Sequence, residues 1–221
     1  MDWQALALSV KLAAVTLVVL LPVGLWVGRW LAYTAFRGKA WIEGLVVLPL
    51  VLPPTVLGYY LLVSLGGASP LGRWLAETFN LRLTFNFLGL VVASVLFNIP
   101  FLIQPVQRAF EAIPRQLAEA AAVSGLSAWQ TFWRVEFPLA WPGVLSAMVL
   151  TFVHTLGEFG VVLMIGGSIP GETKTLAISI YDRVQAFDLA SADRMAALLL
   201  VLSLGAVGAS FFASAKLAVR R

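Results

Sequence analysis

Five long apolar runs dominate the chain, and each is long enough to cross a bilayer, which needs about 20 apolar residues. The second, third and fifth runs contain no charged residue. The runs are Leu8–Trp26, Gly44–Leu65, Phe85–Gln107, Leu139–Ile165 and Met195–Ala215. The pattern therefore predicts an all-α polytopic membrane protein with about five transmembrane helices.

Two shorter segments between these runs are amphipathic. Thr173–Phe187 places Leu176, Ile180 and Val184 on one face at helical spacing. The segment is too short and too charged to span a bilayer, so we predict an interfacial helix on the outer side. The same reasoning predicts a short outer helix over Leu71–Phe79.

Composition supports a membrane protein and excludes several kinds of site. Apolar residues make up 60% of the chain and charged residues 12%, about half the roughly 25% typical of soluble proteins, and the mean hydropathy is +0.91. The absence of cysteine excludes disulfides, thiolate metal sites and cysteine nucleophiles, and the single histidine excludes a histidine metal cluster. We find no cleavable signal pattern, internal repeat or linker, and therefore predict a single domain, 1–221.

The basic residues predict the orientation, because cytoplasmic segments carry an excess of Lys and Arg. With the N-terminus outside and the C-terminus in the cytoplasm, nine basic residues lie on the cytoplasmic side and five on the other. The nine are Arg29, Arg37, Lys39, Arg108, Arg115, Arg134, Lys216, Arg220 and Arg221, and the five are Arg73, Arg82, Lys174, Arg183 and Arg194. Topology, rather than binding to nucleic acid, thus accounts for the net charge of +4.

A helical hairpin is predicted between the third and fourth runs. Pro114 suits the first turn of a short helix, and Gly125 suits the left-handed position that ends it. Ser127 followed by Gln130 indicates a capping box at the start of a second helix. The pattern therefore predicts a helix–turn–helix within a cytoplasmic loop at about 108–138.

Small side chains and prolines complete this hairpin. Ala120, Ala121 and Ser124 leave room for a partner to approach the backbone of the first helix closely. Pro138 and Pro142 are expected to limit the second helix. The alternative interpretation is an ordinary amphipathic hairpin on a membrane surface.

Several polar residues and prolines lie inside the apolar runs. The second run contains Pro53, Pro54 and Thr55, and the third contains Asn98. Prolines free backbone carbonyls, which is tolerated at membrane depth where neighbouring helices or a water-filled path satisfy them. These residues are candidates for a pathway or gate lined by neutral groups; the alternative is that the prolines only kink a helix.

Glu158 and His154 are the ionisable residues of the fourth run. An ionisable residue inside a span is costly, which makes it a candidate functional residue. A carboxylate is a poor ligand for an anion, so we expect Glu158 to have a structural or gating role. His154 lies one helical turn earlier, where it is positioned to hydrogen-bond with Glu158 or to pack as an ordinary histidine.

The sequence offers no site for ATP or for hydrolytic chemistry. Gly38-Lys39 is followed by Ala40 and lacks the first glycine of a phosphate-binding loop. No carboxylate pair or Ser-His-Asp set is apparent. We therefore expect no catalytic residues, metal or cofactor in this chain.

The hairpin also carries a family resemblance. Glu119-Ala120-Ala121, Gly125, Val135 and Phe137-Pro138 follow a spacing that resembles the EAA loop of importer-type ABC permeases, with Val135 and Phe137 in place of the family's Ile and Leu. In that family the loop docks into a groove on a separate ATP-binding subunit. The resemblance implies that coupling residues include Glu119, Ala120, Ala121, Gly125, Leu126, Ser127, Val135 and Pro138, with Glu119 fixing the hairpin by pairing with a basic residue or capping a helix.

Three further stretches narrow the resemblance to the molybdate-type permease subunit. They are Leu48–Gly66, Leu156–Gly160 (LGEFG) and Ser168–Tyr181. The resemblance implies a homodimeric permease in the bacterial inner membrane, with ATP and Mg²⁺ bound by a partner ATPase pair and substrate delivered by a periplasmic or extracellular binding protein. Tungstate and sulfate permeases are related, so the oxyanion class is better defined than the anion.

Two other function classes remain. A stand-alone secondary transporter needs protonatable or ion-coordinating residues near mid-membrane, and the spans offer few beyond His154 and Glu158. A membrane-embedded enzyme needs a polar catalytic cluster at one depth, and none is visible. The sequence therefore favours the permease.

Overall fold

The computed structural model describes residues 1–219, with side chains to Phe212, and all regular secondary structure in this part is helical. Arg220 and Arg221, and the side chain of Lys216, which entered the orientation count, lie outside the described residues. The helices are α1 (Trp3–Tyr33), α2 (Lys39–Val51), α3 (Pro54–Leu65), α4 (Pro70–Phe79), α5 (Phe87–Glu111), α6 (Arg115–Val123), α7 (Ala128–Thr131), a π-helix (Phe132–Glu136), α8 (Phe137–Leu156), α9 (Gly160–Gly166), α10 (Leu176–Gln185) and α11 (Leu189–Val219).

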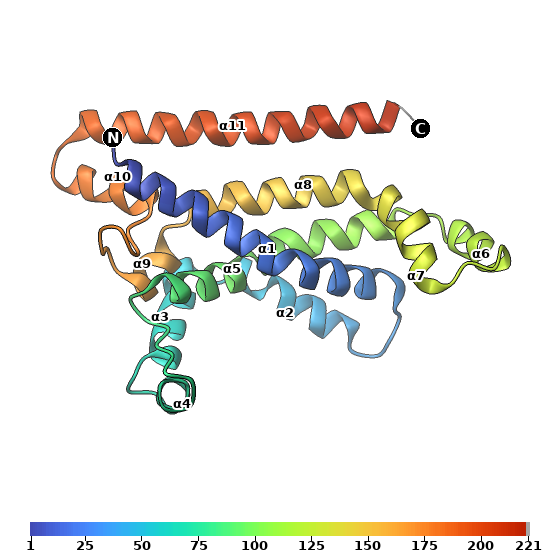
Figure 1. The fold of residues 1–221 in the computed structure, drawn as a ribbon, viewed down its shortest axis with the longest axis horizontal. Helices are drawn as coiled ribbons and strands as arrows, with labels where there is room; N and C mark the ends of the chain where they lie inside the picture. The colour runs from blue at the N-terminus through green and yellow to red at the C-terminus, as the bar shows by residue number, and fades with distance from the viewer. Residues whose placement is uncertain (220–221) are drawn as a thin grey trace.

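Four long helices run roughly along the long axis of the molecule. Figure 1 shows α1, α5, α8 and α11 in this direction, with α6 and α7 at one end and α3, α4, α9 and α10 towards the other. The chain begins at the end opposite α6 and α7. Among the described residues four helices are long and apolar enough to cross a membrane, and the bent pair, counted as one span, makes five. This agrees with the predicted all-α architecture of about five spans.

The predicted second span is the bent pair. Instead of one helix over Gly44–Leu65, α2 and α3 meet at 104°. Leu52 is extended, with φ −72° and ψ 137°, because the residue before a proline is kept out of the helical region. Pro53 and Pro54 supply no N–H to continue the helix. The consecutive prolines therefore break the span rather than kink it.

The boundaries of the fourth span also differ from the prediction. The helix that follows Ser127 does not stop at Pro138 or Pro142 but continues through the π-helix into α8, so that Ala128–Leu156 forms one 29-residue span. A proline is tolerated near a helix start, and a wider turn accommodates the missing donor of Pro138. The span then ends at Leu156, before Glu158, instead of reaching Ile165.

Close packing of α1 against α5 holds the centre of the bundle. A Cβ on Gly28 would lie 2.8 Å from Val106 Cγ1 and 3.1 Å from the backbone nitrogen of Gln107. Only glycine permits this approach, which buries the apolar cluster formed by α1, α5 and α8. Fully buried members of this cluster are Leu102, Val106, Phe110 and Val144.

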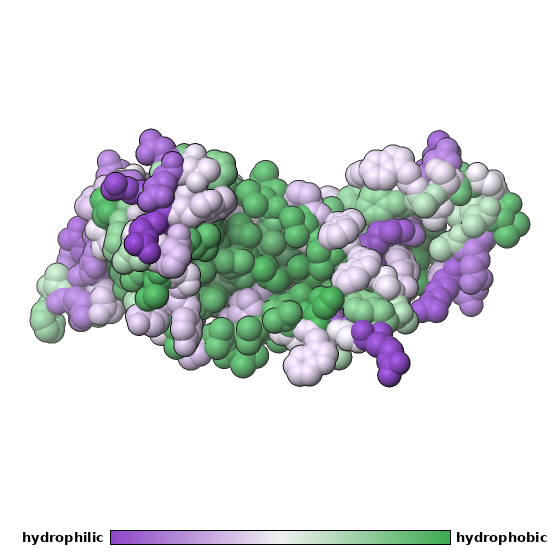
Figure 2. Space-filling view, turned by 90° about the horizontal axis from the view of Figure 1, so that it is seen from below, coloured by the Kyte–Doolittle hydropathy of each residue, from purple (hydrophilic) through white to green (hydrophobic). Residues whose placement is uncertain are grey.

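The surface is divided along the same axis. Figure 2 shows hydrophobic residues across the middle of one face and hydrophilic residues gathered towards its two ends. Exposed apolar side chains include Val18 and Trp26 on α1 and Leu204 on α11. This distribution suits a protein surrounded by lipid at its middle and by water at its ends.

Candidate coupling hairpin and membrane cleft

The hairpin turn forms as the sequence predicts. Gly125 has φ +79°, and the amides of Gly125 and Leu126 donate to the carbonyls of Ala122 and Ala121 at 3.0 and 3.1 Å. The Ser127 amide donates to Gln130 Oε1 at 2.9 Å, while the Gln130 amide donates to Ser127 Oγ at 3.3 Å. The predicted capping box is therefore confirmed, and it fixes the angle at which α7 leaves the turn.

The predicted coupling residues do not all face outward. Glu119, Ala120, Gly125 and Ser127 are exposed, whereas Ala121 is buried inside the chain. The small side chain of Ala121 thus serves internal packing. Leu126 and Val135 are partly buried, and Pro138 is exposed at the start of α8.

Glu119 does not form the ion pair or helix cap within the described part of the chain that the sequence suggested. Among the described residues it has neither an ion pair nor a hydrogen bond through its side chain. The buried carboxylate at this end is instead Glu136, which pairs with Arg29 of α1. Its position 107 residues along the chain from Arg29 explains why local spacing gave no signal of this pair.

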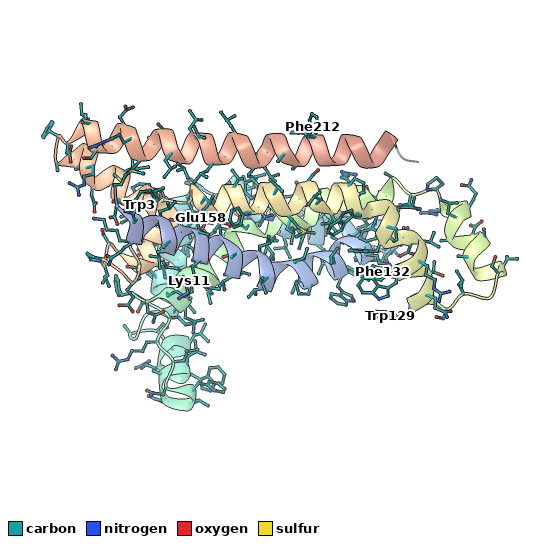
Figure 3. All side chains as sticks on the ribbon, turned by 45° about the horizontal axis from the view of Figure 1, so that its top comes forward. Trp3, Lys11, Trp129, Phe132, Glu158 and Phe212 are labelled. Atoms are coloured by element: carbon teal, nitrogen blue, oxygen red, sulfur yellow. The ribbon has the colours of Figure 1, made fainter. Side chains whose placement is uncertain are left out.

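Aromatic side chains follow the hairpin along one helical surface. Trp129 contacts Phe132 and Trp133, and Trp133 contacts Phe137, with ring centroids 5.2 to 6.1 Å apart. Trp129 is 70% exposed and lies with Phe132 at the hairpin end of the molecule (Figure 3). Their spacing of three or four residues was readable in the sequence.

A cleft of about 520 Å³ lies towards the other end of α8 and brings most of the candidate pathway residues together. We call it the Glu158 cleft. Its walls come from α3, α5, α8 and the segment before α9, and Figure 3 shows Glu158 far from Trp129. The lining residues are Pro54, Thr55, Phe97, Val153, His154, Gly157, Glu158, Phe159 and Gly160.

Glu158 is buried in a closed set of hydrogen bonds. Its carboxylate accepts from Ser94 Oγ and, at 2.8 Å, from Asn98 Nδ2. Asn98, itself fully buried, also donates to the Ser94 carbonyl at 2.8 Å. Both carboxylate oxygens therefore point to donors on α5, which fixes the break between α8 and α9.

His154 reaches Glu158 only through Asn98. The distance from His154 Nδ1 to Asn98 Oδ1 is 2.9 Å, and the imidazole stacks on Phe101 with ring centroids 3.7 Å apart. Because the Asn98 oxygen can only accept, Nδ1 carries the proton of this bond. A direct bond between His154 and Glu158, one option at the sequence level, is thus not formed.

Pro53 is the one pathway candidate that neither lines the cleft nor bonds to a residue that does. It precedes α3, and its carbonyl accepts from the amides of Val56 and Leu57 at 2.9 and 3.2 Å. Its place in the break between α2 and α3 positions Pro54 and Thr55.

Comparison with known proteins identifies the family. Residues 21–221 match the model described as binding-protein-dependent transport system inner membrane component. The chain belongs to this family. It is accordingly a multi-pass inner-membrane transport component rather than a catalytic protein.

Individual members of the family are similar over most of their length. The molybdenum transport system permease protein ModB of Azotobacter vinelandii is 50% identical over 88% of this chain and 86% of its own. ModB of Escherichia coli strain K12 is 35% identical over 83% and 80%. The sulfate transport system permease protein CysT of the same strain is 36% identical over 76% of this chain and 61% of its own.

Solved importers share the fold. A bacterial alginate ABC transporter, in complex with an alginate pentasaccharide-bound periplasmic protein, gives a TM-score of 0.76 at 17% identity, covering 94% of this chain and 76% of that one. The inward-facing MetNI methionine ABC transporter gives 0.70 at 18% identity, covering 98% and 94%. The family's fold is therefore that of an ABC importer permease.

Proposed function

We propose that this chain is the membrane-spanning subunit of a molybdate importer, in which ATP is hydrolysed by separate subunits. The observation that carries the proposal is the 50% identity to a molybdenum transport permease over 88% of the chain. The exposed hairpin of α6 and α7 supports it, because a motor subunit needs a rigid contact outside the membrane. The N-terminus then lies outside and the hairpin in the cytoplasm.

Two copies of the chain would enclose the pathway. Within its described residues each copy has four helices of full spanning length and one bent pair, and its Glu158 cleft is open to the surface rather than enclosed. A binding protein would deliver the anion at the outer end, near α4 and α10. ATP and Mg²⁺ would be bound by the ATPase pair, so this chain needs no cofactor.

Transport would follow from switching between two arrangements of rigid helices. Closure of the ATPase pair would move the hairpin, and the continuous helix from Ala128 to Leu156 would carry that movement to the Glu158 cleft. Thr55 and His154 supply polar groups for the anion there, while Ser94 and Asn98 occupy the oxygens of Glu158. The carboxylate would then shape the gate without facing the anion.

The test is ATP hydrolysis by the reconstituted complex, with binding protein loaded with molybdate, tungstate or sulfate. We expect molybdate to stimulate most strongly. Gly125→Trp should prevent assembly with the ATPase, because it places a bulky, strained residue at the exposed turn. Gly171→Trp is the control for assembly, scored as ATPase subunit retained in the complex and not as stimulation by the binding protein: Gly171 also has a positive φ, +78°, and open space around it, but lies before α10, away from the hairpin.

The outcomes separate the alternatives. Stronger stimulation by sulfate or tungstate would replace molybdate as the substrate, a relevant alternative given the similarity to CysT. Assembly that survives Gly125→Trp as well as Gly171→Trp would show that the hairpin is surface structure only. A chain that transports without any ATPase would be a secondary transporter.

A further inference from the structure

One partly buried ion pair joins the first span to the helix that follows the hairpin. Arg29 Nε donates to Glu136 Oε2 at 2.5 Å and Arg29 Nη2 donates to Glu136 Oε1 at 3.0 Å. This is the two-pronged geometry that fits a guanidinium to a carboxylate most closely. The side chain of Glu136 is only 5% exposed, so its carboxylate has lost most of its contact with water. The ion pair with Arg29 offsets that loss of hydration.

The surroundings hold Arg29 in place. Its guanidinium lies 5.4 Å from the centre of the Tyr33 ring and 5.6 Å from that of Phe132. Gly28, the preceding residue, is pressed against α5. The guanidinium thus extends from a fixed part of α1 onto the helix that leaves the hairpin.

Glu136 lies where that helix is irregular. It is the last residue of the π-helix Phe132–Glu136, and the Phe137 amide donates to the Phe132 carbonyl five residues earlier. Such turns are rare and are frequently found at functional sites. A π-turn can become an α-helical turn when the chain on one side shifts by one residue, so it can take up movement between the segments on its two sides. A side chain anchored at its end opposes that shift and makes the two segments move together.

Stability alone does not account for this arrangement. Burying the Glu136 carboxylate costs about as much as its attraction to the partly exposed Arg29 returns, so this pair adds little net stability compared with apolar residues of the same size. Its two hydrogen bonds are directional, because both form together only when the two helices keep the alignment seen in this structure. Here those helices are α1 and the continuation of the hairpin.

We propose that Arg29 and Glu136 are positioning residues that couple hairpin movement to α1, so that the hairpin, the π-helix and α1 move as one body during transport. This inference rests on the proposed importer function. Without the pair, the movement of the hairpin changes only the conformation of the π-helix. The ATPase then hydrolyses ATP without rearranging the membrane helices.

The test compares molybdate transported per ATP hydrolysed in proteoliposomes containing the full complex and loaded binding protein. Arg29→Gln should lower this ratio about tenfold, within the range that coupling residues produce. Arg29→Lys keeps the positive charge but cannot form both hydrogen bonds of the guanidinium, so we expect a ratio between those of Arg29→Gln and wild type. Arg37→Gln is the control, since it removes an exposed positive charge near the same end of α1.

A second variant separates coupling from folding. Arg29→Gln leaves Glu136 buried and unpaired and can reduce the yield of complex, whereas Arg29→Gln/Glu136→Gln removes both charges and leaves two amides. We expect the double variant to assemble with its ATPase subunits at wild-type yield and still transport at a low ratio. A wild-type ratio in the assembled double variant would overturn the proposal, as would a loss of transport in strict proportion to lost complex.

Failure of the underlying function has a different signature. If the wild-type complex hydrolyses ATP but moves no molybdate, tungstate or sulfate, the importer proposal itself fails. If wild type transports the anion and the Arg29 variants keep the wild-type ratio of molybdate transported to ATP hydrolysed, the importer proposal stands and the coupling role of the ion pair is wrong.

Discussion

At the scale of single residues, Asn98 holds the polar wall of the Glu158 cleft together. Its amide group bonds Glu158, His154 and the Ser94 carbonyl at once. Asn98→Leu keeps a similar volume but leaves the carboxylate and the imidazole without these partners. We expect the free energy of unfolding to fall by about 3 kcal/mol, since each buried polar group left unsatisfied costs about 1–3 kcal/mol. Thermal unfolding in detergent measures it.

Thr151 provides the matched control on the neighbouring helix. Its hydroxyl is buried and, within the described part of the chain, has no hydrogen-bond partner. Thr151→Val removes that hydroxyl at constant shape, so stability should stay equal or rise. Equal losses in Asn98→Leu and Thr151→Val would mean that the network of Asn98 contributes nothing beyond packing.

At the scale of elements, the contact of α1 with α5 depends on Gly28. The methyl group of Gly28→Ala would need space now filled by Val106 and by the Gln107 backbone. We expect a loss of about 1–3 kcal/mol in the free energy of unfolding, because overpacked cores lose that amount. Unfolding of the detergent-solubilised wild type and Gly28→Ala variant measures this loss.

Gly44 in α2 gives the opposite expectation for the same substitution. No atom lies within 4 Å of where its Cβ would be. Gly44→Ala should therefore stabilise the protein by about 0.5–1 kcal/mol, through a smaller loss of backbone entropy on folding. If both variants lose stability alike, the α1–α5 contact is looser than the distances indicate.

Features set by local sequence could be predicted, whereas contacts between distant residues could not. Long apolar runs located the candidate spans, although not the break in the second or the bounds of the fourth, and turn chemistry located Gly125 and the capping box, because both signals are local. The helix breaks before the consecutive prolines Pro53 and Pro54 but continues through Pro138 by way of a π-turn, so the presence of proline alone could not choose between kink, break and π-turn. Asn98 and Glu158 were recognised singly, but their contact spans 60 residues and needed the fold.

At the scale of the whole molecule, one carboxylate ties the start of the chain to α10. Asp2 accepts from the Ala5 amide at 3.0 Å and from Ser179 Oγ at 2.8 Å. Burial alone would raise the pKa of Asp2, but these two hydrogen bonds, together with Lys174 and Arg183, lower it below its ordinary value of 3.8. The ionised form is therefore the one that stabilises the fold.

The sign of the pH dependence follows. Because the pKa is lower in the folded state, the contribution of Asp2 is complete above the ordinary value of 3.8 and is lost as the pH falls through the folded pKa. The difference in melting temperature between wild type and Asp2→Ala should be constant from neutral pH to about pH 5 and shrink below pH 4. A difference that grows on acidification would contradict this assignment.

The Glu158 cleft and the α6–α7 hairpin lie towards opposite ends of the bundle, joined by the helix from Ala128 to Leu156. The two ends can therefore evolve separately. On the proposed function, changes around the cleft after gene duplication would alter the anion carried by one copy, while the unchanged hairpins of both copies would still bind the same ATPase subunits. This separation would allow a lineage to diversify in the nutrients that it takes up without a new ATPase for each.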